Sequence, residues 1–136
     1  MATVNCFEDL EIWQLARKLY QKISKLADKI KKNHDYRFAD QIKASAGSVM
    51  DNIAEGFERN SRLEFVNSLS ISKGESGELK SQLYRSLDDN YLIDGEFEEL
   101  YEDTDKVSKK IANFVKYLNN SKIKGLKFKN RTDAER

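Results

Sequence analysis

Apolar residues recur along this chain with the spacing of an amphipathic helix. In the first such stretch they alternate steps of four and three residues, at Ile12, Ala16, Leu19, Ile23, Leu26 and Ile30. A second row repeats every seven residues beside it, at Trp13, Tyr20 and Ala27. This spacing places apolar side chains on one wide face of an α-helix. It therefore predicts a helix over residues 10–32 that is covered on more than one side, as in a helical bundle.

Three further stretches keep the same spacing and are separated by short polar breaks. They predict a second helix over residues 36–58, a third from residue 62 to about residue 90, and a fourth over residues 95–119. Connections of about two to four residues make each helix turn back beside its predecessor. The predicted fold is therefore all-α, an antiparallel up-down-up-down four-helix bundle over residues 7–120.

Two polar residues are candidate helix caps. Ser61 precedes Glu64 by three positions, a capping-box arrangement that predicts the start of the third helix. Asp94 lies directly before the fourth predicted helix, where its carboxylate can accept a hydrogen bond from a first-turn amide.

The last segment, residues 121–136, has no helical stripe and is expected to be a disordered basic tail. Its cationic side chains alternate with apolar ones, a pattern that suits contacts with phosphate groups. The candidate phosphate-binding residues of the tail are Lys122, Lys124, Lys127, Lys129 and Arg131.

Charge is balanced over the whole chain but not along it. The 136 residues include 24 basic and 23 acidic side chains, for a net charge of +1, yet the tail carries +4 and the remainder −3. A second basic cluster ends the first predicted helix, with Lys22, Lys25, Lys29 and Lys32 as candidate nucleic-acid-binding residues. In an up-down bundle this cluster lies beside the acidic start of the fourth helix, so the alternative is that the two faces neutralise each other.

The composition limits the cellular compartment in which the protein is expected and the kinds of chemistry that it can perform. Cys6 is the only cysteine, so an internal disulfide is excluded, and no segment approaches 18 consecutive apolar residues. A cytoplasmic protein with no membrane contact is expected. The single histidine, His34, falls in a predicted turn, and no Glu-x-x-His pair or phosphate-binding loop is present. The chain is therefore predicted not to be an enzyme and to hold no metal or other cofactor.

Small and polar residues within the predicted helices need a structural explanation. Gly74 and Gly77 each cost about 1 kcal/mol in a helix interior relative to alanine, so they are expected to face the second helix or a neighbouring subunit. The polar residues Asn52, Glu55, Glu78 and Gln82 are expected to form interhelical hydrogen bonds. Exposed parts of the wide apolar rows are candidate subunit contacts, at Trp13, Tyr20, Phe57 and Tyr84.

Spaced motifs on the second and third predicted helices match a known family. The string Asn52-Ile53-Ala54-Glu55-Gly56 is followed by Gly74 and then by Glu78-Leu79-x-x-Gln82-Leu83. With these motifs the chain resembles, over residues 7–118, the four-helix bundle proteins encoded in intervening sequences of bacterial large-subunit ribosomal RNA genes. Glu75 departs from the small hydroxyl residue usual after that glycine.

The resemblance implies a homopentameric ring of up-down bundles. It also implies a relation to the accessory protein of diversity-generating retroelements, which binds nucleic acid and a reverse transcriptase. The ring of those relatives is strongly basic, whereas residues 1–120 of this chain carry −3. The first functional hypothesis is a non-enzymatic, homo-oligomeric bundle that acts as a nucleic-acid-associated accessory or scaffolding protein, with RNA or DNA as partner. The alternative is a protein-interaction adaptor with no nucleic-acid role.

Overall fold

A computed structural model describes residues 4–120 of the chain, which form a short 3-10 helix and four α-helices. The elements are η1 (Phe7–Asp9), α1 (Glu11–Lys32), α2 (Tyr36–Glu58), α3 (Arg62–Asp88) and α4 (Asp94–Asn120). No β-strand occurs within this part of the chain, so the all-α prediction with four helices is confirmed. The bounds of α2 agree with the prediction, and those of the other helices differ by one or two residues at an end.

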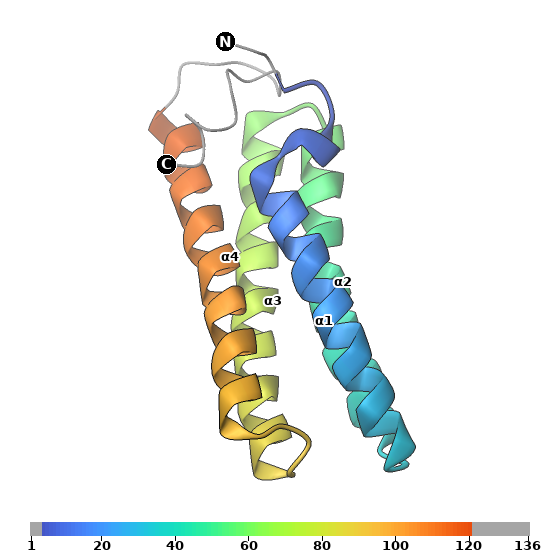
Figure 1. Cartoon of the computed structure of the whole chain (residues 1–136). Coiled ribbons are helices and arrows are strands. Elements are labelled where there is room, and N and C mark those ends of the chain that lie inside the picture. Colours follow the sequence, from blue (N-terminus) through green and yellow to red (C-terminus); the bar gives the residue numbers. More distant parts are fainter. Residues whose placement is uncertain (1–3, 121–136) are drawn as a thin grey trace.

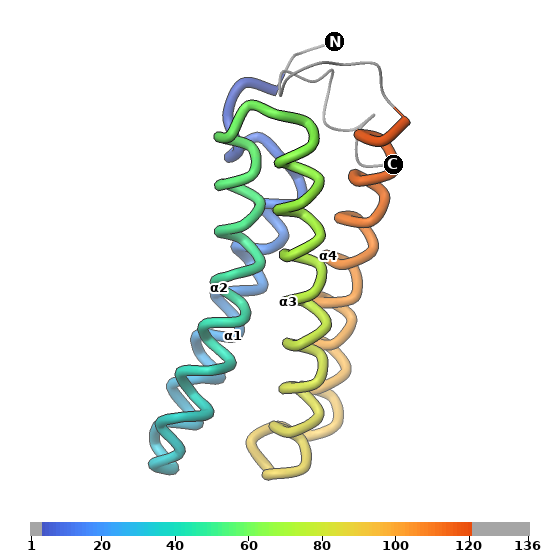
Figure 2. Tube along the Cα trace, turned by 180° about the vertical axis from the view of Figure 1, so that it is seen from behind, coloured from blue at the N-terminus to red at the C-terminus, as the bar shows by residue number. Residues whose placement is uncertain are grey.

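The four helices lie side by side along the length of the molecule (Figure 1). The α1–α2 and α3–α4 connections lie at one end, and the α2–α3 connection lies at the other, as Figure 2 shows from behind. Hydrogen bonds join segments that are distant in sequence at both ends. The Tyr91 hydroxyl donates to Asp35 Oδ2 at 2.9 Å, and Arg62 Nη1 donates to the Leu118 carbonyl at 3.4 Å.

The apolar stripes that predict the helices form one continuous core. All six residues of the first stripe are buried, and the fully buried Phe65 of α3 lies at the aromatic centre. Its ring centroid is 5.5 Å from that of Phe114 and 6.0 Å from that of Phe57. Phe57 is 3% exposed, so the prediction that it is an exposed subunit contact is wrong. It packs edge-on against Phe65 and fills the space between α2 and α3.

One of the two predicted helix caps is confirmed. Ser61 Oγ accepts a hydrogen bond from the Glu64 backbone N–H at 3.4 Å, at the start of α3. Asp94 is instead the first residue of α4. There the Glu96 carboxylate reaches back to accept from the Ile93 backbone N–H at 3.0 Å. A glutamate within the first turn thus takes the capping role that was predicted for Asp94.

Close approach between α2 and α3 occurs at a glycine other than the predicted ones. A Cβ atom on Gly56 would lie 2.6 Å from Ser68 Cβ and 2.9 Å from Phe65 Cδ1. A Cβ atom on Gly74 or Gly77 would have nothing within 4 Å. The prediction that these two glycines face α2 is therefore wrong, because both lie on the open side of α3. The alternative, that Gly74 and Gly77 contact a neighbouring subunit, stays a prediction.

Candidate functional site

Acidic residues of α4 pair with only one lysine of the predicted basic cluster on α1. Lys22 Nζ lies 2.6 Å from Asp103 Oδ2 and 3.8 Å from Glu99 Oε1, and the hydrogen bond with Asp103 raises the pKa of the lysine. The basic end of α1 does lie beside the acidic first half of α4, as the up-down arrangement would require. Lys22 is consequently neutralised within the chain and is poorly placed for an external phosphate.

The other three lysines of the predicted cluster are exposed cations. Lys25, Lys29 and Lys32 make no ion pair with any residue from 4 to 120. Lys25 and Lys29 line one wall of a cleft of about 270 Å³ whose opposite wall includes Glu96 and Glu99. Because these lysine side chains are long and exposed, they can reach phosphate groups on the outer side of α1.

The second predicted basic cluster lies outside the described residues. Residues 121–136 are not described by the structure, so the phosphate-binding role assigned to Lys122, Lys124, Lys127, Lys129 and Arg131 stays a prediction.

Two of the polar motif residues bond to residues four positions away along the chain. Asn52 Nδ2 donates to the Ser48 carbonyl at 2.8 Å and to Ser48 Oγ at 3.0 Å. Glu55 Oε1 accepts from Arg59 Nη2 at 2.8 Å. The expected interhelical hydrogen bonds of Asn52 and Glu55 are therefore replaced by bonds to Ser48 of α2 and to Arg59, the residue that caps α2. Residues four apart on one helix are neighbours, and their side chains meet without having to cross to another helix.

The other two motif residues, Glu78 and Gln82, line a groove between α2 and α3. This groove has a volume of about 410 Å³. The α2 wall consists of Gln41, Ala44, Ser45 and Ser48, and the α3 wall consists of Glu75, Glu78, Gln82 and Arg85. Arg85 and Gln41 were not among the candidate site residues. The polar spacing of three, four and three residues from Glu75 to Arg85 is the sequence signal that would have identified this wall.

The electrostatics of the groove are dominated by its two carboxyl groups. Burial, followed by the hydrogen bond with Glu78 and the charge of that residue, raises the pKa of Glu75. The Arg85 guanidinium does not neutralise the pair, because it lies over the Phe38 ring with 4.3 Å between its Cζ and the ring centroid. The groove thus holds two acidic groups that have no basic partner among residues 4–120.

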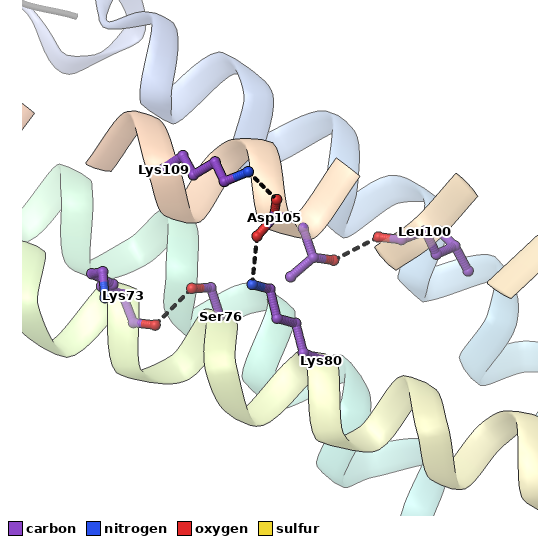
Figure 3. A network of polar contacts seen from close by, with 7 residues as sticks. Lys73, Ser76, Lys80, Leu100, Asp105 and Lys109 are labelled. Carbon is purple, nitrogen blue, oxygen red and sulfur yellow. Dashed lines mark hydrogen bonds and ion pairs between the residues drawn. The ribbon is translucent and has the colours of Figure 1, made fainter. Parts of the chain in front are cut away.

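A separate polar network joins α3 to α4 (Figure 3). Asp105 lies between two lysines, with Oδ1 2.7 Å from Lys80 Nζ and Oδ2 2.8 Å from Lys109 Nζ. The hydrogen bond with Lys109, and then that with Lys80, lowers the pKa of Asp105 to about 2. Each oxygen of this carboxylate therefore has its own cation, and the network has the geometry of a structural clamp.

This clamp predicts an acid-dependent loss of stability. Because the pKa of Asp105 is lowered in the folded state, its contribution is complete above the ordinary value of 3.8 and is lost as the pH falls toward about 2. We expect Asp105→Asn to flatten the fall of the melting temperature across this interval, as measured by circular dichroism. Asp51→Asn is the control, since Asp51 is exposed and makes no ion pair within residues 4–120. An equally steep fall in Asp105→Asn would contradict the assignment.

Among residues 4–120 no group of three or more His, Cys, Asp or Glu residues could hold a metal ion. His34 lies in the α1–α2 connection, with Nδ1 2.9 Å from the Tyr36 hydroxyl. No helix in the described part of the chain is long and apolar enough to cross a membrane.

Comparisons with known proteins agree with this fold. A model of the family described as "23S rRNA-intervening sequence protein" matches residues 8–113. A crystal structure of a protein of unknown function from the S23 ribosomal protein family of Bacteroides thetaiotaomicron is similar, with a TM-score of 0.73 and 22% identity. That similarity covers 77% of this chain and 98% of the other. No curated protein matches the sequence.

Proposed function

Since the chain belongs to the 23S rRNA-intervening sequence protein family, we propose that it is a non-enzymatic, self-associating helical bundle that serves as a nucleic-acid-associated accessory or scaffolding protein. In this proposal up-down bundles assemble into a homopentameric ring in the cytoplasm. The relation to the accessory protein of diversity-generating retroelements is part of the same proposal.

The observation that carries the nucleic-acid role is the set of unpaired cations on α1. Lys25, Lys29 and Lys32 lie within eight residues of one another and remain free of acidic partners within residues 4–120, although acidic side chains on α4 lie near. Three exposed lysines at one end of a bundle that carries −3 overall concentrate positive charge locally. Such a cluster supplies the sequence-independent attraction to phosphate that dominates non-specific nucleic-acid binding.

Support for self-association comes from the open side of α3. Ile71 is 56% exposed on this side, and Gly74 and Gly77 follow it with no atom within 4 Å of an added Cβ. An exposed apolar side chain is costly to leave in water, and so is the helix backbone exposed at the two glycines. The absence of side chains at the glycines also permits another helix to approach closely. A second copy packed on this face would offset both costs.

The nucleic-acid role is tested by charge removal at the α1 cluster. We expect Lys25→Gln/Lys29→Gln/Lys32→Gln to bind RNA and DNA more weakly than the unmodified protein. If all three lysines contact phosphates, the slope of log K against log salt for duplex DNA should fall by roughly 2 to 3. Binding is measured by fluorescence anisotropy across a salt titration, with the light-scattering mass of every sample recorded.

The matched control removes the same charge elsewhere. Lys18, Lys106 and Lys116 are exposed and free of ion pairs within residues 4–120. Their triple Gln variant should therefore keep the part of the slope that depends on Lys25, Lys29 and Lys32. Equal weakening in the two triple variants would contradict a localised site. If the unmodified protein binds no nucleic acid at low salt, the adaptor alternative replaces the proposal. A monomeric mass would contradict the assembly.

A further inference from the structure

The α2–α3 groove contains acidic groups without a counter-ion. Glu75 and Glu78 are one turn apart on α3, and neither forms an ion pair with any residue from 4 to 120. Their mutual contact is part of the cause of the raised pKa of Glu75. Two carboxyl groups held this close repel each other when both are ionised, and a cation bound between them would remove that repulsion.

A buried oxygen in the same groove also lacks a partner. Gln82 lines the groove with only 4% of its surface exposed, and its Oε1 atom has no hydrogen-bond partner. A buried acceptor left in this state costs about 1–3 kcal/mol, so folded proteins rarely leave one unsatisfied. This acceptor is an observation independent of the two carboxyl groups, which contact each other.

The remaining groove residues leave the entrance open. On the α2 wall Ala44 and Ser48 are small, and on α3 Gly74 and Gly77 carry no side chain beside the two glutamates. Arg85 is held against Phe38 and does not occupy the acceptor positions. A long side chain from another polypeptide can therefore enter the groove while its backbone lies close to α3.

We propose that the α2–α3 groove binds the guanidinium group of an arginine presented by a polypeptide, with Glu75, Glu78 and the amide oxygen of Gln82 as acceptors. A guanidinium is planar, permanently charged and carries five N–H donors, so one group can serve two carboxylates and an amide oxygen. An ammonium group has a compact charge and lacks this planar fork. Free arginine and an arginine of a second copy or another protein share this chemistry.

The experiment titrates N-acetyl-arginine amide into the full-length protein and follows the Gln82 side-chain amide by ¹H–¹⁵N NMR. We expect a saturable shift of that signal and weaker binding of N-acetyl-lysine amide. N-acetyl-citrulline amide, which has nearly the same shape but no charge, should give no saturable shift. The double variant Glu75→Gln/Glu78→Gln should lose at least tenfold in affinity, whereas Glu98→Gln/Glu102→Gln, which removes two exposed acids from α4, should not.

Light scattering on the same samples separates the sources of the arginine. If the probe binds and the mass of the assembly falls, the natural arginine comes from a second copy. If the probe binds at unchanged mass, the groove is open to a different polypeptide. If no shift is seen because a second copy already fills the groove, Glu75→Gln/Glu78→Gln will itself lower the mass. The absence of a saturable shift together with an unchanged mass in that variant overturns the proposal, as does equal binding of the citrulline probe.

Discussion

Phe65→Ala is expected to lower the free energy of unfolding by about 3–5 kcal/mol, the usual cost of deleting a buried phenylalanine side chain. Phe65 is fully buried and lies between Phe57 of α2 and Phe114 of α4, so its removal leaves a cavity that reaches three helices. For a chain of this length the melting temperature should fall by roughly 10–18 °C. Urea unfolding followed by circular dichroism measures the change.

Two further variants make this prediction specific. Leu63→Ala removes a side chain that is 66% exposed on the first turn of α3, and it should change the free energy of unfolding by no more than about 0.5 kcal/mol. Phe65→Leu retains most of the buried apolar volume and provides a folded variant if Phe65→Ala does not fold. We expect it to lose less than half as much stability. A cost below about 1 kcal/mol for Phe65→Ala would show that this aromatic cluster does not organise the core.

Gly56→Ala is expected to destabilise the protein by about 1–3 kcal/mol, although alanine is the better helix former. The new Cβ atom would lie 2.6 Å from Ser68 Cβ and 2.9 Å from Phe65 Cδ1, which are closer than such atoms can pack. Either α3 must move away from α2 or the Phe65 ring must shift. The loss is measured as the change in free energy of unfolding in urea.

Gly47→Ala is the matched control on the same helix. Its Cβ atom would be 3.6 Å from the Tyr20 ring, an ordinary contact, so the variant should gain about 0.5–1 kcal/mol from helix propensity. The two alanine substitutions should therefore have opposite signs. Stabilisation by both substitutions would mean that helix propensity, and not the contact between α2 and α3, sets the effect at Gly56.

The helices could be predicted from the sequence because each has an apolar stripe of unbroken helical period. The stripe depends only on spacing along one segment, and burial then follows from the same positions. Phe57 shows the limit of this reasoning. A residue on the edge of a stripe is buried or exposed according to what the neighbouring helix presents, and here that helix presents Phe65.

The hydrogen-bond and ion-pair partners of the polar site residues were harder to predict, because they depend on how the helices pack against one another. Nothing in the local sequence of α1 separates Lys22 from Lys25, yet Lys22 lies opposite Asp103. Asn52 and Gln82 are both amides within helices. Asn52 has a serine four residues before it to receive its hydrogen bonds, whereas no donor lies within hydrogen-bond distance of the Gln82 oxygen. Such differences depend on rotation and contact between helices.

The length of the bundle sets the length of nucleic acid that can contact both of its ends. α4 ends at Asn120, at the end of the molecule opposite to the α1–α2 connection (Figure 1), so Asn120 lies far from the end of α1 that carries Lys25, Lys29 and Lys32. With 27 residues, α4 is about 40 Å long. Because a duplex rises about 3.4 Å per base pair, a single straight duplex must have roughly 12 base pairs to extend from one end of the bundle to the other. Ligand length is therefore a variable that separates contact with one end of the bundle from contact along its whole length.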